Sequence, residues 1–390
     1  MPIGYWESEH LLAPADLTVI GAGLVGMSTA LHHRARHPEH RIRIIERDIL
    51  ADGGSTRNAG FACFGGPGEW RDDLEAIGKE RWLALVEQRA IGLRALVDLI
   101  GQDKLGLEWT GAWELFDRTD DGRTRAASVM QELRVMAEAV HPIMVRHLGP
   151  VHPGGIGMPV LVPDPDRAAH FGGHAAIRLP WEGMLHTGRM IEAFHRKLAE
   201  ADIQCLNGCT VLGFEEAGPA GSGWNITTDR GEMSSRQVAI CTNAWAARLE
   251  PELDVRPVPN RVMVVQPKTP PPKGAYHVED GYLYFRTLPG GKVLFGGGRH
   301  FGIGWPEEPG QPSSAEAEWD RRLMASARRW LGPIDAVTHQ WTGWLGVGRD
   351  RQPLIGSSAP GLHYAVRMGG MGVAMGCGLG RELAARISAQ

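Results

Sequence analysis

The sequence predicts an α/β protein with two domains, one built on a parallel sheet and the other on an antiparallel sheet. Three observations lead to this prediction. The 390 residues are more than a single domain usually contains. An apolar strand near the N-terminus runs into a glycine-rich turn and a helix, as in proteins with parallel sheets. Strands with alternating apolar and polar residues recur in the second half, which is typical of an antiparallel sheet.

The parallel sheet begins at residues 17–20, which are apolar at nearly every position, as expected of a strand buried on both faces. The glycine-rich turn 21–26 follows this strand directly. Next come a helix over 25–35 and a second strand over 42–45, which ends at Glu46. This strand–turn–helix–strand unit predicts a Rossmann-like domain.

The middle of the chain is expected to be mainly helical. Apolar residues at helical spacing predict helices over 72–101 and 124–140, with a strand over 109–116 between them. Prolines and glycines concentrate over 149–166, which indicates a connection between the two domains.

The second half contains mainly short strands. We expect them at 204–206, 210–214, 224–228, 237–241, 281–286 and 292–296. Helices are expected at 187–201 and 315–331, and the last block, 337–390, contains strands and a terminal helix. Prolines over 251–272 mark a second crossing between the domains.

Composition and charge exclude several classes of protein. The chain is 43% hydrophobic and 22% charged, as an ordinary globular protein is. A net charge of -4 favours neither nucleic acid nor a polybasic membrane surface as a partner. The five scattered cysteines predict no metal site and no disulfide framework. No apolar run has signal-peptide or membrane-spanning length, so we expect a cytoplasmic protein.

The turn at Gly21, Gly23 and Gly26 has the spacing of a dinucleotide-binding motif. The first glycine makes the tight turn, the second lets a pyrophosphate approach the backbone, and the third packs the helix against the strand. Free N–H groups at the helix start can then bind the phosphates. Glu46 can accept hydrogen bonds from a ribose, and its charge disfavours a 2′-phosphate. The motif predicts an ADP moiety, but it does not separate NAD from FAD.

Three further segments resemble the D-amino-acid-oxidase family of flavoenzymes, which includes sarcosine oxidase and glycine oxidase. They are the small-residue loop 53–60, the turn 242–245, and the C-terminal segment 341–372. The turn departs from the family because Thr242 and Asn243 replace its usual small residues. The C-terminal segment is the strongest match. Its glycine run permits close approach to a flat ring, and the following helix presents its positive end to reduced flavin.

The resemblance implies FAD as the cofactor and identifies the residues expected to bind it. They are Gly21, Gly23, Leu24, Val25, Gly26, Glu46, Arg47, Ser55, Thr56, Arg57, Asn58, Ala59, Gly60, Val211, Thr242, Asn243, Trp245, Gly346, Arg367, Gly369, Gly370, Met371, Gly372 and Val373. The FAD is expected to be non-covalent, because Gly343 aligns near the cysteine that tethers FAD in sarcosine-oxidase-like members.

Catalysis in this family depends mostly on geometry. The substrate C–H is held over flavin N5, the amine is neutral, and a hydride leaves to the ring, so no catalytic triad is required. The resemblance makes Tyr284, Arg286 and His300 the candidate catalytic residues. Tyr284 and Arg286 share a strand face and could bind a substrate carboxylate.

Two departures from the family bear on the substrate and the electron acceptor. Glycine-oxidase-like members carry a carboxylate-binding arginine where this chain has Leu345, so Arg286, Arg299 or Arg349 would have to replace it. Sarcosine-oxidase-like members use a lysine to activate oxygen where this chain has Phe295. Oxygen and other electron acceptors therefore both stay open.

The predicted function is FAD-dependent removal of a hydride from the C–H next to the nitrogen of a small amine or amino acid, giving an imine. The alternatives are oxidation of a 2-hydroxy acid, a non-catalytic flavin-binding subunit, and an NAD-dependent enzyme. The FAD-binding domain is expected to comprise residues 1–85, 165–247 and 338–390, and the substrate-binding domain 86–164 and 248–337. The sequence does not predict the oligomeric state.

Overall fold

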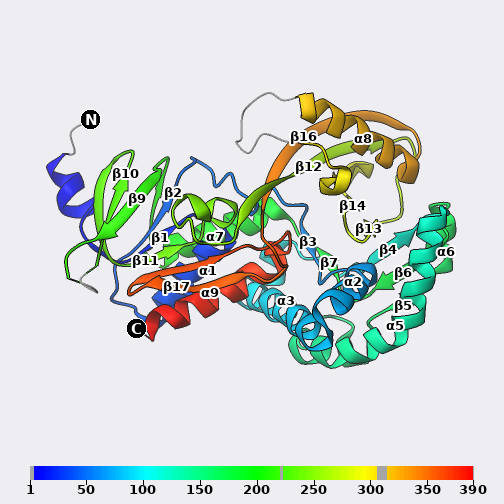
Figure 1. Ribbon diagram of the computed structural model, residues 1–390, viewed down its shortest axis with the longest axis horizontal. Coiled ribbons are helices and arrows are strands. Elements are labelled where there is room, and N and C mark those ends of the chain that lie inside the picture. Colours follow the sequence, from blue (N-terminus) through cyan, green and yellow to red (C-terminus); the bar gives the residue numbers. More distant parts are fainter. Residues whose placement is uncertain (1–3, 220–222, 305–313, 390) are drawn as a thin grey trace.

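The computed structural model describes residues 4–219, 223–304 and 314–389, and it contains two large sheets, each with helices packed against it (Figure 1). The first sheet has the strand order β17-β18-β11-β1-β2-β8, with β10 and β9 attached beside β11. Its strands are β1 (Ala15–Ile20), β2 (Ile42–Glu46), β8 (Gln204–Asn207), β9 (Val211–Glu216), β10 (Trp224–Thr228), β11 (Gly231–Ile240), β17 (Leu354–Ala359) and β18 (Leu362–Val366). The core of this sheet, from β18 to β8, is parallel.

The helices of the first sheet pack closely through glycines. They are α1 (Leu24–Arg36), α3 (Lys79–Ile100), α7 (Thr187–Glu200) and α9 (Gly372–Ser388). A Cβ atom at Gly380 would lie 2.6 Å from the Cβ of Ser28, and one at Gly378 would lie 2.8 Å from the Cα of Gly92. Glycine is therefore what lets α9 approach α1 and α3, and Figure 1 shows α9 and α1 side by side.

The second sheet has the order β16-β12-β15-β14-β13-β4-β6-β5 and is mainly antiparallel. Its strands are β4 (Ala112–Phe116), β5 (Val162–Pro163), β6 (Ala175–Leu179), β12 (Arg256–Pro267), β13 (Ala275–Val278), β14 (Leu283–Thr287), β15 (Val293–Gly297) and β16 (Ile334–Val347). Helix α8 (Ser314–Leu331) places Trp319 and Leu323 in the same buried cluster as Phe285 and Phe295 of this sheet.

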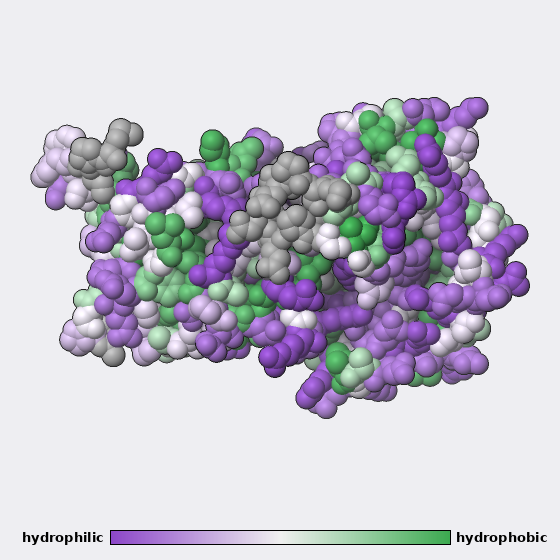
Figure 2. All heavy atoms as spheres, turned by 45° about the horizontal axis from the view of Figure 1, so that its top comes forward, coloured by the Kyte–Doolittle hydropathy of each residue, from purple (hydrophilic) through white to green (hydrophobic). Residues whose placement is uncertain are grey.

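Shorter elements complete the fold. Strands β3 (Phe61–Ala62) and β7 (Gly183–Met184) form a small third sheet. The remaining helices are α2 (Pro67–Ile77), α4 (Gln102–Leu105), α5 (Asp120–His147) and α6 (Pro165–His170). Short 3₁₀ segments lie at Gly155–Gly157, Asn243–Arg248, Pro289–Gly291 and Arg299–Phe301, and a short π-helical segment lies at Glu7–Leu11. None of the helices in the described ranges combines the length and the apolar character needed to cross a bilayer. Figure 2 shows hydrophilic side chains over most of the visible face, with apolar residues in smaller separate groups.

One sequence-based expectation about the elements is wrong: the helix expected over 72–101 is interrupted at Gly78, whose φ of 80° ends α2 and precedes α3. The proline-rich segment 251–272 follows β11 of the first sheet, and its residues 256–267 form strand β12 of the second sheet. Pro257 and Pro259 are tolerated there because this part of β12 pairs only with β16, while β15 pairs with residues 261–265. A proline lacks the N–H that a second partner strand would need.

The two sheets draw on several separate parts of the chain. Strand β6 belongs to the second sheet although it lies in segment 165–247, and β16 extends across position 338. The division into two domains stays a prediction, with these strands as the places where the chain passes between the sheets.

Candidate active site

A cavity of about 600 Å³ extends from the start of α1, past the start of α9, to the inner face of the second sheet. Both helices direct their N-terminal ends at it, since Leu24 and Gly372 are among the residues that line it. Neither helix has a side-chain hydrogen bond from its N-cap residue. Backbone N–H groups at two positive helix ends are therefore available to an anionic or electron-rich ligand.

The turn before α1 requires its glycines. Gly21 has a φ of 102°, and a Cβ atom there would lie 3.0 Å from the carbonyl oxygen of Cys241. A Cβ atom at Gly26 would lie 2.0 Å from the carbonyl oxygen of Gly21. The Leu24 N–H donates to the Ser55 hydroxyl at 2.9 Å, so Ser55 fixes the small-residue loop against the start of α1.

Glu46 lies at the end of β2 and lines the cavity. Its carboxylate accepts hydrogen bonds from the backbone N–H groups of Ala22, at 2.8 Å, and Asp48, at 3.1 Å. A carboxylate can accept about four hydrogen bonds, so it keeps capacity for the hydroxyls of a ribose. Arg47, beside it, pairs with Asp48 at 3.0 Å.

The loop 53–60 is held in shape by Asn58. The Asn58 amide nitrogen donates to the carbonyl oxygen of Ser55 at 2.7 Å, and its amide oxygen accepts from the N–H of Gly60 and the hydroxyl of Thr187, both at 2.8 Å. The Trp341 indole N–H donates to the carbonyl oxygen of Arg57 at 3.0 Å. The loop is thereby attached both to α7 and to β16.

The glycine loop before α9 is held by residues that lie behind it. The Asn243 amide oxygen accepts from the N–H groups of Arg367 and Met368, each at 3.1 Å. The Gly369 N–H donates to the carbonyl oxygen of Gly346 at 3.0 Å. The buried Arg367 guanidinium donates to Asp350 at 2.6 Å, to the Asp254 carboxylate at 2.7 Å and to the Gln352 carbonyl oxygen at 2.7 Å.

Most of the residues predicted to bind FAD line this one cavity. They are Gly21, Gly23, Leu24, Val25, Glu46, Arg47, Ser55, Arg57, Asn58, Ala59, Gly60, Val211, Thr242, Asn243, Trp245, Gly369, Gly370, Met371, Gly372 and Val373. Gly26, Thr56, Gly346 and Arg367 do not line it. These four residues lie behind the cavity lining, where their contacts shape the turn before α1, the loop 53–60 and the glycine loop before α9.

Two polar residues of the second sheet, His277 and Tyr284, line the cavity. They are paired on β13 and β14, and His277 is also paired with Glu114 on β4, so the three side chains share a face of the sheet. The Tyr284 hydroxyl oxygen accepts from the Asn260 amide at 2.6 Å, which leaves its own proton available to donate. Burial raises the pKa of Tyr284 to about 12, so this hydroxyl stays protonated.

Arg286 does not occupy the position expected of a carboxylate-binding residue. One of its terminal nitrogens donates to three carbonyl oxygens, those of Leu185 at 2.7 Å, Gly60 at 2.8 Å and Ala59 at 3.2 Å. Arg286 does not line the cavity. Burial lowers the pKa of Arg286 to about 10. The guanidinium connects β14 to the end of the loop 53–60, which is a structural role.

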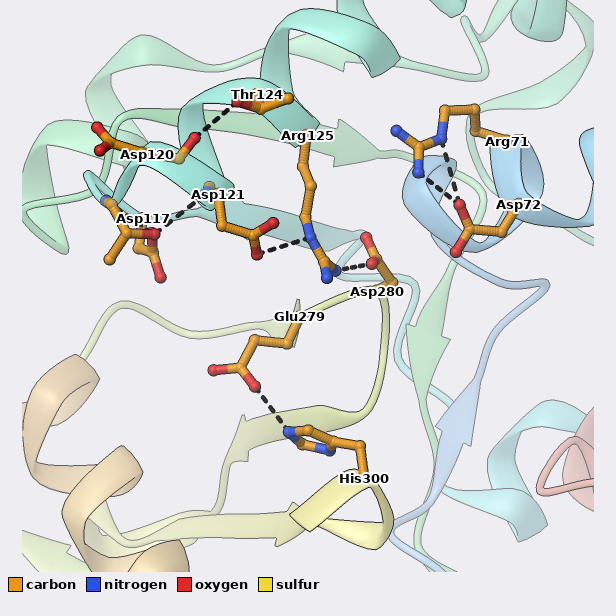
Figure 3. Close-up of polar contacts among 12 residues, drawn as sticks. Arg71, Asp72, Asp117, Asp120, Asp121, Thr124, Arg125, Glu279, Asp280 and His300 are labelled. Carbon is orange, nitrogen blue, oxygen red and sulfur yellow. Dashed lines mark hydrogen bonds and ion pairs between the residues drawn. The ribbon is translucent and has the colours of Figure 1, made fainter. Parts of the chain in front are cut away.

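His300 also lies outside the cavity lining. It is exposed and pairs with Glu279 at 2.9 Å (Figure 3). Glu279 and Asp280 form the turn between β13 and β14, and both have positive φ angles, 51° and 52°. Figure 3 shows Arg125 of α5 bridging Asp121 and Asp280, so an ion pair holds this turn.

Arg299 lines the cavity near the glycine loop. Its guanidinium lies 4.7 Å from the centre of the Tyr282 ring, and one nitrogen lies 3.8 Å from where a Cβ atom of Gly370 would be. Leu345 is equally close to that Gly370 position, at 3.8 Å. Arg299 makes no hydrogen bond or ion pair with any residue that the structure describes, which leaves its donors free for a ligand.

Sequence reasoning missed several charged residues of this site. Arg89 is buried, lines the cavity and pairs with Glu69 at 2.9 Å. His277 also lines the cavity and bonds the buried carboxylate of Glu182 at 3.0 Å. One signal could have found His277 and Glu114: each interrupts an otherwise apolar strand.

One group of possible metal ligands lies elsewhere. His37, Glu39 and His40 have ligand atoms within 4.8 Å of one another, and all three lie beyond the cavity lining, after α1. The sequence analysis did not anticipate this group.

Comparison with known proteins agrees with this geometry. The model of the family DAO, described as FAD dependent oxidoreductase, matches residues 16–386. The chain is 25% identical over 386 residues to the probable oxidoreductase OrdL of Rhizobium meliloti (strain 1021), covering 92% of this chain and 79% of that protein. It is 26% identical over 208 residues to the gamma-glutamylputrescine oxidoreductase of Escherichia coli (strain K12), covering 48% of this chain and 45% of that protein.

Solved structures share the fold. Glycine oxidase from Geobacillus kaustophilus has a TM-score of 0.73 and 18% identity, covering 96% of this chain and 95% of that chain. Iminodiacetate oxidase from Chelativorans sp. BNC1 has a TM-score of 0.70 and 16% identity, with the same coverage of 96% and 95%.

Proposed function

Because the chain belongs to the DAO family of FAD-dependent oxidoreductases, we propose that it oxidises a small amine or amino acid at the C–H next to nitrogen. FAD supplies the hydride acceptor when bound. The residues present fit this cofactor: side chains are missing where the backbone must approach it, at Gly21, Gly369 and Gly370, and two helix ends whose N-cap residues make no side-chain hydrogen bond face the same cavity.

The chain's own residues would bind different parts of the cofactor at the two helix ends. We assign the pyrophosphate to the start of α1 and the ribose to Glu46, as the contacts of the turn and the carboxylate suggest. We assign the flavin to the glycine loop before α9, because this loop faces Tyr284 and Arg299 across the cavity. The positive end of α9 would stabilise negative charge on the reduced ring.

The single observation that carries the substrate assignment is the free guanidinium of Arg299. It lies at the glycine loop, beside Leu345, and has no hydrogen-bonding partner within the described ranges. We propose that it binds the substrate carboxylate, while Tyr284 donates its hydroxyl proton to another polar group of the substrate. Glycine and iminodiacetate, for which the two structurally similar oxidases are named, both carry a carboxylate beside a C–N bond.

The test is an anaerobic titration of the FAD-loaded protein with amines, N-methyl and D- and L-amino acids, and 2-hydroxy acids. Loss of the oxidised flavin absorbance with one class identifies the substrate, and reoxidation in air distinguishes an oxidase from a dehydrogenase. We expect reduction by amines or amino acids. Reduction only by 2-hydroxy acids, or by nothing in the panel, would overturn the proposal.

Arg299→Met tests the carboxylate assignment. A hydrogen-bonded charge pair contributes roughly 1.5–3 kcal/mol, so kcat/KM for a carboxylate substrate should fall about 10- to 150-fold. Activity with an amine that lacks a carboxylate should change little. Arg321→Met, which removes an exposed arginine of α8, is the matched control. An equal loss for both kinds of substrate contradicts the assignment.

A further inference from the structure

The pair His277–Glu182 has the geometry of an oriented base in the cavity. The Glu182 carboxylate is buried and accepts from the Nε2 of His277 at 3.0 Å and from the N–H of Phe64 at 2.8 Å. A carboxylate can bond this nitrogen only if Nε2 carries the proton. The neutral ring therefore has its lone pair on Nδ1.

The Nδ1 atom of His277 is not used by the contact with Glu182. His277 lines the cavity, and its Nδ1 has no hydrogen-bonding partner among the residues that the structure describes. Nδ1 is not one of the polar atoms that are both inaccessible and without a partner. Because it has no partner, it must be accessible, so it borders open space. The Phe61 ring lies 5.3 Å from the His277 ring and 5.5 Å from the Tyr284 ring, so the base is next to the tyrosine assigned to the substrate.

We propose that His277, oriented by Glu182, accepts the proton that a substrate ammonium group must lose before its hydride can leave. This inference rests on the proposed amine oxidation. It deepens that proposal by assigning the substrate as a protonated amine.

The step balances in atoms and electrons. An N–H bond of the ammonium group breaks, and its proton forms a bond to Nδ1 of His277. The nitrogen lone pair that remains forms the C=N bond as the neighbouring C–H bond breaks. The hydride from that bond reduces the bound FAD, the substrate becomes an iminium ion, and water then hydrolyses it. His277 loses its proton to solvent between turnovers.

Charged groups around His277 favour its role as a proton acceptor. Glu182, Glu114 of β4 and Glu69 of α2 act on it, and Tyr284 is its paired residue on β14. Burial by itself lowers the pKa of His277, but the Glu182 carboxylate outweighs burial, and the pKa is raised above its ordinary value. The acceptor form is therefore lost as the pH falls through this raised pKa.

The test compares His277→Asn and Glu182→Gln with the wild-type holoenzyme in anaerobic stopped-flow reduction across pH. General-base catalysis contributes on the order of 10²–10⁴-fold, so His277→Asn should slow flavin reduction at least 100-fold at pH 7. The loss should shrink as the pH rises and the amine deprotonates in solution. In Glu182→Gln, the limb of the profile that belongs to His277 should move to lower pH, because the carboxylate that raises its pKa is gone.

A second readout does not depend on turnover. Long-range ¹H–¹⁵N NMR of histidine-labelled holoenzyme reports which nitrogen carries the proton, with His277→Gln assigning the signal. We expect a proton on Nε2 in the wild type. In Glu182→Gln we expect it on Nδ1, because the new amide can donate to Nε2 while its oxygen still accepts from Phe64.

A matched pair of the same chemistry serves as the control. His147 and Glu87 join α5 to α3 at 2.8 Å, away from the cavity, so His147→Asn should leave the pH profile unchanged. Reduction of His277→Asn within threefold of the wild type, or a neutral wild-type ring whose proton lies on Nδ1, overturns the inference while amine oxidation stands. If no amine reduces the wild type, amine oxidation fails, and the NMR result still decides the orientation of His277.

Discussion

Replacing Arg367 by methionine should weaken FAD binding by about 10- to 150-fold, although Arg367 does not line the cavity. Its side chain is 5% exposed and donates to Asp254, Asp350 and the carbonyl oxygen of Gln352. Its backbone N–H is held by Asn243, and its φ is 67°. These contacts hold the glycine loop at the start of α9 in the shape that the flavin is expected to meet.

The size of the expected loss of FAD affinity depends on which of the lost hydrogen bonds water can replace. Hydrogen bonds from a charged donor contribute roughly 1.5–3 kcal/mol each. The side chains of Asp254 and Asp350 are 41% and 52% exposed. Water can therefore solvate both carboxylates when the guanidinium is removed, which recovers most of the free energy of their two hydrogen bonds. About 1.5–3 kcal/mol remains for the Gln352 carbonyl oxygen and the order of the loop. At about 1.4 kcal/mol for each factor of ten, this corresponds to the expected loss of affinity.

The assay is a fluorescence titration of the apoprotein with FAD, for the wild type, Arg367→Met and Arg386→Met. Arg386 lies on α9, the helix that follows the glycine loop. It forms an exposed pair with Glu382, and such a pair contributes little to stability. Its replacement should leave the Kd for FAD unchanged. A Kd within threefold of the wild type in Arg367→Met would show that the loop keeps its shape without this guanidinium, and the reasoning would be refuted.

Three more predictions follow from single residues. Gly26→Ala places a Cβ atom 2.0 Å from the carbonyl oxygen of Gly21. We expect the free energy of unfolding, measured by denaturant titration, to fall by about 1–3 kcal/mol. We also expect weaker FAD binding, measured by flavin fluorescence. Glu114 is buried, which raises its pKa to about 7 from 4.5. The folded protein therefore binds the proton more tightly, and stability falls as the pH rises from 4.5 to 7. Glu114→Gln lacks this loss and should gain about 3 kcal/mol relative to the wild type between pH 4.5 and 8, whereas a pH-independent difference measured by denaturant titration would contradict the buried carboxyl. Finally, precipitation with acid should leave all the FAD in the supernatant, since Gly343 offers no tether; yellow colour in the pellet would contradict non-covalent binding.

Local patterns explain why so much of the cofactor site was predictable. The shape of the turn from Gly21 to Gly26 is set mainly by nearby residues. Its glycines leave room for the backbone of the turn itself and for the backbone of Cys241 beside it. Glu46 follows from the same unit, since it ends the strand that succeeds the helix. The loops around Asn58 and Gly370 were identified through the family resemblance, and the structure places both at the same cavity.

The sequence by itself determined the α/β class, the Rossmann-like unit and the family of this protein, because these depend on residue spacing along short segments. Only the tertiary structure decided which charged side chains reach the cavity. Arg286 has the right strand face, but the carbonyl oxygens of Gly60 and Leu185 bind its guanidinium, while Arg299 stays free. His277 meets Glu182 across 95 positions of sequence. Contacts of this kind depend on how strands and loops from distant parts of the chain pack together, and no local spacing encodes that.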